Sequence, residues 1–174
     1  VTAQTLTTQR GNVIIRNSSK LTANSVAGNK SLDGDLSIES GSEVEVNGST
    51  ALDIDGNVTV GGTLTLSTTS GGGLNVGGDL EINGTLTPNG RTVTLNPLSG
   101  ETSIVSTSGA SISFDGFSHT TAGTVELADP ISVAGLFTAT GGPITESTTG
   151  GSPITFNSGG TQNFGAATSI ASAI

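Results

Sequence analysis

A repeat of 22 residues in the first two thirds of the chain constrains the fold more than any other feature. Four glycines are spaced by 22 positions, and each precedes Asp, Asn or Glu: Gly34, Gly56, Gly78 and Gly100. After each of the first three glycines, apolar residues alternate with polar ones, as in Leu36-Ser37-Ile38. Two further registers share the period, since Leu52 and Ile54 return as Leu74 and Val76, and Thr63 and Leu64 return as Thr85 and Leu86. Alternation of this kind indicates strands with one buried face.

Three strand-like pieces in each 22 residues predict an all-β fold, a three-sided parallel β-helix (β-solenoid) of about 22 residues per coil and 7–8 coils. Each coil stacks on the next at the strand spacing, so equivalent Leu, Ile and Val side chains form columns inside a narrow tube. Gly, Asn and Asp suit the corners between the three sides, because they tolerate unusual backbone angles or bond to the backbone.

Composition agrees with a thin core and excludes several classes of protein. The 174 residues include 27 Gly, five Phe and no Cys, Trp or Tyr, and 11% are charged. Without Cys there are no disulfides, thiolate metal sites or Cys nucleophiles. The net charge of −9 argues against nucleic acid as a partner, and no apolar window is long enough for a membrane-spanning helix.

We expect residues 1–174 to form a single solenoid domain with two irregular ends. Residues 1–30 carry four bases and no acid, and should form an irregular first coil with a leading strand over 1–8. Residues 31–102 are the regular coils. Residues 103–174 contain all five Phe and keep a looser period of 19 to 21, which predicts coils of a different shape.

Three stretches carry a resemblance to a known class: GNVTVGGTLTL, GGDLEINGTLTPNGRTVTLN and SPITFNSGGTQNFGAAT. They resemble the coils of bacterial extracellular β-solenoid proteins of the filamentous-haemagglutinin-like and adhesin-like class. The resemblance implies a secreted or cell-surface protein that acts as a filament, adhesin or matrix component. It also implies host or surface glycans as partners.

Candidate sites for a cofactor or for catalysis are few. Asp35, Asn57 and Asp79 should stack along one corner, where their oxygens could hold Ca²⁺, but we favour hydrogen bonding of these side chains to the backbone at the corner. No other cofactor is expected. The single His, His119, is interpreted as a solvent-facing or hydrogen-bonded loop residue, and the pair Asp53 and Asp55 as a solvated strand face.

Two surface patterns remain open. Glycosylation sequons occur five times, at Asn17, Asn29, Asn47, Asn57 and Asn83. Thr-rich strands suggest an ice-binding face, but Thr59 should align with Glu81 and interrupt the Thr array.

The charge layout predicts self-association. Residues 1–30 are net +4, whereas residues 31–81 hold nine acids and no base. Open solenoid ends pair readily with further strands, so we expect a homo-oligomer or filament, built head to tail with N-terminal strand addition. The residues assigned to this contact lie at the two ends of the chain: Val1, Thr2, Leu6, Arg10, Arg16, Ile170 and Ile174.

The sequence therefore predicts a non-enzymatic, extracellular structural protein, either a fibre subunit or an adhesin segment. Two alternatives stay open: a carbohydrate- or ice-binding module, and a polysaccharide-processing β-helix enzyme.

Overall fold

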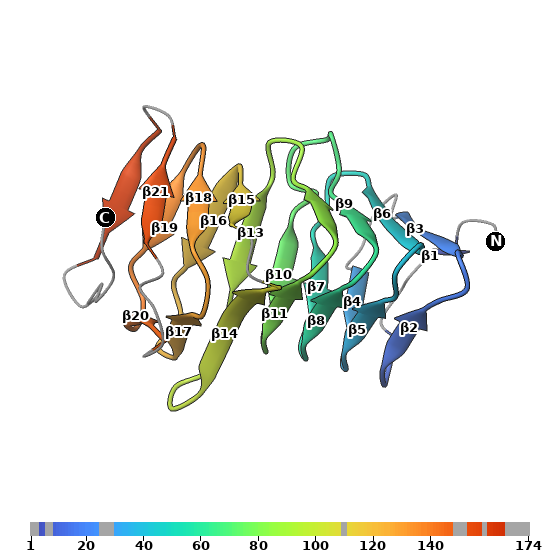
Figure 1. The fold of residues 1–174 in the computed structure, drawn as a ribbon, viewed down its shortest axis with the longest axis horizontal. Helices are drawn as coiled ribbons and strands as arrows, with labels where there is room; N and C mark the ends of the chain where they lie inside the picture. The colour runs from blue at the N-terminus through green and yellow to red at the C-terminus, as the bar shows by residue number, and fades with distance from the viewer. Residues whose placement is uncertain are drawn as a thin grey trace.

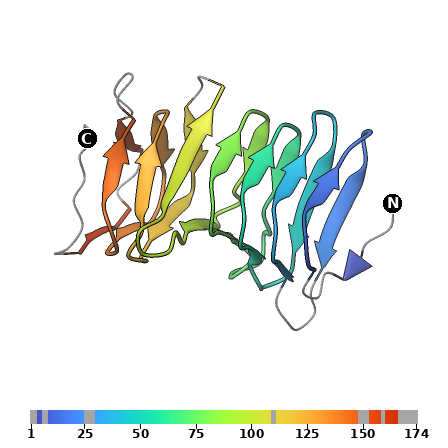
Figure 2. The ribbon, with the colours of Figure 1, turned by 90° about the horizontal axis from the view of Figure 1, so that it is seen from below.

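The structure is a rod of stacked parallel strands. The computed structural model describes residues 4–5, 9–24, 30–108, 111–147, 153–157 and 160–165, and within these ranges all helix-or-strand structure is strand. The first and last coils lie at opposite ends of the longest axis in two perpendicular views (Figure 1, Figure 2). The predicted all-β parallel β-solenoid is therefore confirmed.

The strands form two long sheets and two shorter ones, which we name faces A to D. Face A contains β1 (Gln4–Thr5), β3 (Lys20–Asn24), β6 (Glu43–Asn47), β9 (Thr63–Thr65) and β12 (Thr85–Thr87). Face B contains β4 (Lys30–Leu32), β7 (Leu52–Ile54), β10 (Leu74–Val76), β13 (Thr92–Leu95), β16 (Gly116–His119), β19 (Phe137–Ala139) and β22 (Gln162–Phe164). Face C contains β2 (Val13–Ile15), β5 (Leu36–Ile38), β8 (Val58–Val60), β11 (Leu80–Ile82), β14 (Thr102–Thr107), β17 (Thr124–Leu127) and β20 (Ile144–Glu146). Face D contains β15 (Ile112–Phe114), β18 (Ile131–Val133) and β21 (Ile154–Phe156).

The coil length averages 22 residues. On face B, six steps of strand pairing lead from Lys30 to Gln162. The seven strands are thus separated by about six full coils in the described residues, fewer than the 7–8 that the sequence predicted. Individual steps on this face range from 19 residues, between Leu74 and Val93, to 25, between Phe137 and Gln162. The predicted range of 19 to 21 for the C-terminal coils was too narrow.

The repeating Gly–Asp and Gly–Asn pairs form one corner of the tube. A Cβ atom on Gly56 would lie 2.4 Å from Oδ1 of Asp35 and 2.8 Å from the carbonyl carbon and oxygen of Gly34. A Cβ atom on Gly78 would meet Oδ1 of Asn57 and the carbonyl of Gly56 in the same way. Only glycine fits there, because each coil lies directly on the backbone of the coil before it.

One predicted register is wrong. Gly100 was aligned with Gly78, but Leu80 pairs with Val105, three residues beyond the predicted partner. Gly100 has φ of +86° and belongs to a turn in which Glu101 N–H donates to the carbonyl of Leu98. The extra residues of this turn lengthen the coil between β11 and β14.

The third side of the tube is interrupted near its middle. Face A ends at β12 and face D begins at β15, and no ladder joins these two strands in the described residues. Faces B and C continue past this point, so the rod does not divide. Leu86 on β12 is only half-buried, whereas its partner Leu64 on β9 is completely buried.

Beyond the interruption, phenylalanines replace aliphatic side chains in the core. Phe114, Phe117 and Phe137 are fully buried. The rings of Phe117 and Phe137 stack with centroids 5.6 Å apart, and Phe137 also meets Phe156 and Phe164 at 5.2 and 5.5 Å. The core of these coils is therefore built from larger side chains than the core of the regular coils.

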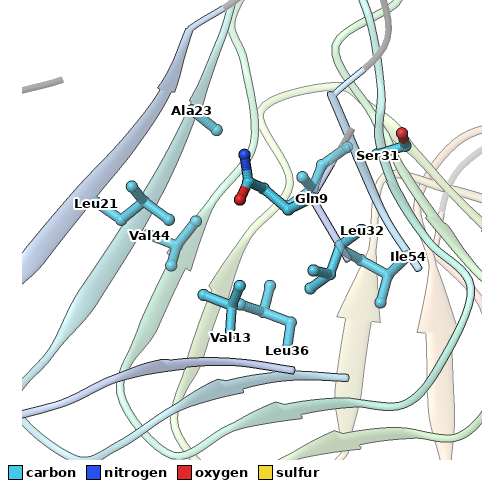
Figure 3. Close-up of a pocket in the computed structure, with 10 residues that line it drawn as sticks. Gln9, Val13, Leu21, Ala23, Ser31, Leu32, Leu36, Val44 and Ile54 are labelled. Atoms are coloured by element: carbon cyan, nitrogen blue, oxygen red, sulfur yellow. The ribbon is translucent and has the colours of Figure 1, made fainter. Parts of the chain in front are cut away.

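The chain itself covers two of the three sides at the N-terminal end of the core, faces A and B. β1 pairs in parallel with β3, so a leading strand exists and lies on the first coil of its own chain. Next to it, Gln9 bridges to Leu32 and its side chain points into a small apolar cavity (Figure 3). The cavity has space of about 10 Å³, at most one water molecule, between side chains that include Leu21, Leu36 and Val44.

Candidate functional site

A ladder of Asn and Asp side chains runs along the corner between faces B and C. Each side-chain Oδ1 accepts a hydrogen bond from a backbone N–H one coil further on. Asn12 accepts from Asp35 at 3.0 Å, Asp35 from Asn57 at 2.8 Å, and Asn57 from Asp79 at 2.7 Å. Asp79 accepts from Ile104 at 2.8 Å, where the ladder ends.

This geometry supports the favoured interpretation of the column Asp35, Asn57 and Asp79. One oxygen of each side chain is bonded to the neighbouring coil and holds successive coils in register. Among the described residues, no three His, Cys, Asp or Glu side chains are grouped so as to hold a metal ion. Binding of Ca²⁺ by this column stays a prediction.

Removing one member of the ladder should weaken the stack of coils. We expect Asn57→Ala to lower the free energy of unfolding by about 1–2 kcal/mol, because the N–H of Asp79 loses its acceptor. Asp79→Asn keeps an Oδ1 acceptor and should change stability by less than about 0.5 kcal/mol. Urea unfolding curves of the two variants test the difference, and equal losses would contradict a role for the ladder.

His119 lies inside the tube and not on a loop. It is completely buried on β16, and its two ring nitrogens lie 3.3 Å from the carbonyl oxygen of Leu95 and 3.1 Å from that of Gly123. The expectation of a solvent-facing loop residue was wrong, whereas its hydrogen bonding is confirmed. The ring therefore joins β16 to the preceding coil at Leu95 and to the turn that follows β16 at Gly123.

Lys30 is, like His119, a polar residue whose burial was not predicted from the sequence. It is completely buried on β4, and its Nζ donates to the backbone oxygen of Thr50 at 2.6 Å and to Oγ1 of Thr50 at 3.0 Å. Burial lowers the pKa of this amine. The charged form is disfavoured because desolvation removes its water shell.

The lowered pKa of Lys30 predicts a pH dependence of stability. Between the folded pKa and the unfolded value of 10.5, the unfolded chain binds the proton more strongly, so stability rises with pH. We expect the wild type to gain stability relative to Lys30→Met as the pH rises toward 10.5. Thermal unfolding at several pH values measures this, and parallel curves for the two proteins would contradict it.

Exposed charges on face A are paired across coils. Nζ of Lys20 lies 2.7 Å from Glu45 and 2.9 Å from Glu43 on the next coil. These contacts, with Glu45 first, raise the pKa of Lys20, and the bond from Lys20 lowers the pKa of Glu45. Lys20 of the first coil thus neutralises part of the acidic charge of residues 31–81.

The remaining surface candidates lie apart from one another. Asp53 points outward from β7 and Asp55 follows it at the corner. Thr59 pairs with Glu81, as predicted, so the Thr array is interrupted. Of the sequon residues, Asn17 and Asn83 are exposed, Asn47 lies on β6, Asn57 belongs to the ladder, and Asn29 falls outside the described residues.

The residues assigned to self-association are described only in part. Val1, Thr2, Leu6, Ile170 and Ile174 lie outside the described residues. Arg10 and Arg16 lie on the first coil, and both are exposed. The Arg10 side chain is 91% exposed, with its Nε 3.9 Å from Asp33. These bases are therefore accessible at the N-terminal end of the rod.

Comparisons with known proteins add no assignment. No helix able to cross a membrane occurs in the part of the chain that the structure describes. No family model, no curated protein and no solved structure matches the chain.

Proposed function

We propose that this chain is an extracellular structural protein that acts without catalysis and assembles head to tail into fibres. The observation that carries the proposal is the open edge at each end of the rod. In the described residues β2 at one end pairs only with β5, and β20, β21 and β22 at the other end each pair with one strand. Such edges present unpaired backbone groups to a further strand.

The direction of the strands favours a head-to-tail contact. All strands of a face run in parallel, so the last coil of one copy presents the same strand direction as the first coil of the next. The contact uses two different surfaces and therefore repeats without closing, which produces a filament. β1 already covers the edge of β3, and Gln9 covers the edge of β4, so the added strands would extend face C directly and continue faces A and B beyond β1 and Gln9.

Charge supports the same orientation. Residues 1–30 carry Arg10, Arg16, Lys20 and Lys30 and no acid, whereas residues 116–174 carry three acids and no base. Lys20 and Lys30 have partners within the chain. Arg16 is exposed, and Arg10 stays 91% exposed although its Nε lies 3.9 Å from Asp33, so these two arginines can attract the acidic end of another copy. This attraction should weaken at high salt.

A proline on the open edge of β2 tests the proposal. The N–H of Val13 donates to the carbonyl of Asp35, the residue before β5, so the N–H of the next residue, Ile14, faces the open edge. Ile14→Pro removes that donor while keeping the bonds to β5. Ile14→Thr is the matched control, because it removes the same exposed apolar side chain and keeps the N–H.

We expect the wild type and Ile14→Thr to form assemblies that grow with concentration, and Ile14→Pro to sediment as single chains. Thermal unfolding of all three proteins establishes that the proline variant is folded. Assemblies of Ile14→Pro that match those of the wild type would overturn the edge contact, and a wild type that stays monomeric at all concentrations would overturn the proposed function.

A further inference from the structure

A polar groove crosses face B beside the interruption of the third side. It consists of two adjoining hollows that share Gly90 and Thr92, with volumes of about 350 and 410 Å³, and we name it the Arg91 groove. It extends from Ala51, before β7, to Leu136, before β19. Four strand spacings separate β7 from β19, so the groove is about 19 Å long.

The groove is lined in part by glycines that the packing of the coils requires. A Cβ on Gly73 would lie 2.4 Å from the carbonyl oxygen of Thr92, and one on Gly135 would lie 2.3 Å from that of Asp115. No larger residue fits at either position, so this part of the lining is backbone.

A rigid turn places Arg91 in this groove. Asn89 and Gly90 have φ of +50° and +73°, and the N–H of Arg91 donates to the carbonyl of Pro88 at 2.8 Å, as in a tight Asn–Gly turn. The turn is bonded to both neighbouring coils: the Asn89 amide donates to the carbonyl of Leu66, and the N–H of Gly90 donates to the carboxylate of Asp115. The backbone that carries Arg91 is therefore fixed before any ligand arrives.

The guanidinium of Arg91 is available to a ligand. Its Nε donates to the carbonyl of Asn89 at 3.1 Å, and its other nitrogens have no hydrogen-bond or ion-pair partner in the described part of the chain. Arg91 is also the only Lys or Arg in the sequence after Lys30. Two parallel N–H groups of a guanidinium fit the two oxygens of a carboxylate.

The rest of the lining suits a ligand rich in hydroxyl groups. Asn75 and Thr94 point outward from neighbouring strands of face B, and Asp115 lies in the second hollow. The backbone of β7, β10, β13, β16 and β19 is already paired on both sides, so an extended peptide cannot add to this face as a strand. Recognition must come from side chains that bond to hydroxyls, with the exposed Leu136 to contact an apolar sugar face.

We propose that the Arg91 groove binds a short glycan that carries a single carboxylated sugar, with the carboxylate on Arg91. A single charge is specified because the chain has a net charge of −9, which repels densely charged polyanions. The site does not require assembly of the protein and is independent of the proposed fibre.

The test uses oligosaccharides that end in glucuronate, galacturonate or N-acetylneuraminate, each beside a counterpart whose carboxyl group is reduced to an alcohol. Calorimetric titration should show binding of at least one carboxylated probe and at least about tenfold weaker binding of its reduced counterpart. Arg91→Gln should weaken binding of the carboxylated probe by the same factor. Lys20→Gln, which removes an exposed positive charge on β3 of face A, away from the groove, should leave binding unchanged.

Three results with the sugar probes would overturn the proposal. These are the absence of binding by every carboxylated probe, equal binding of the reduced counterpart, and unchanged binding by Arg91→Gln with its melting temperature intact. A glutamate-rich peptide that binds as tightly as the best sugar would also overturn it, because the groove would then select carboxylates on a protein.

Discussion

Phe137→Ala is expected to lower the free energy of unfolding by about 3–5 kcal/mol, the largest effect of any single change considered for this chain. Phe137 is completely buried and its ring meets those of Phe117, Phe156 and Phe164. Truncation removes these contacts and leaves a cavity that coils paired on both sides cannot close. In a solenoid each coil is stabilised by its neighbours, so the coils beyond β19 should lose stability first.

Phe164→Ala is the matched control for this prediction. Phe164 contacts the same ring but lies on β22, with 47% of its surface exposed. Its loss should cost about 1 kcal/mol or less, because solvent and neighbouring side chains fill the space. Guanidinium unfolding of both variants measures the difference. Equal losses would contradict the position of Phe137 at the centre of the aromatic core.

Gly56→Ala is expected to cost about 2–4 kcal/mol, although it adds a single methyl group. That methyl group would lie 2.4 Å from Oδ1 of Asp35 and 2.8 Å from the carbonyl of Gly34, so two coils must separate. The same movement would stretch the bond from the N–H of Asn57 to Asp35. Strain and the loss of a ladder bond therefore act together.

A second substitution separates these two causes. In an Asp35→Ala background the nearest oxygen is absent, so Gly56→Ala should cost less than in the wild type, while the clash with the Gly34 carbonyl remains. Ser37→Ala, on the outer side of β5, should change stability by less than about 0.5 kcal/mol. Thermal and chemical unfolding of the single and double variants measures the coupling free energy between positions 35 and 56. A Gly56→Ala variant as stable as the wild type would contradict the close contact of successive coils.

The regular coils could be predicted from the sequence because each level of the pattern agrees. Alternation places Leu36, Val58 and Leu80 inside the tube, and the 22-residue period stacks them in one column. Gly56 and Gly78 each precede the Asp or Asn that bonds to the next coil. The Gly–Asn and Gly–Asp dipeptides therefore account for both the close stacking of the coils and the hydrogen-bond ladder.

The prediction failed at Gly100, because this glycine keeps the 22-residue spacing but lies in a turn and not in the corner of the tube. Glu101 follows this glycine, and its longer side chain bonds within the local turn and does not reach the next coil as Asp or Asn would. The distinction between Glu and Asp was therefore the signal that the repeat had ended. The ladder instead closes on the N–H of Ile104.

Two buried polar residues could have been found by alternation. Ser118 points outward between Phe117 and His119, which places the imidazole on the inner side with Phe117. On β4, Ser31 points outward in the same way, which places Lys30 on the inner side with Leu32. The Arg91 groove could not be found by such reasoning, since it depends on where face A ends and on a turn bonded to two coils.

Electron microscopy of negatively stained protein tests the central claim, assembly of the solenoid rod end to end. The account predicts filaments one rod wide whose length increases with protein concentration and decreases at high salt, because open parallel edges and opposite end charges join successive copies. Single rods of uniform length at every protein concentration would contradict it.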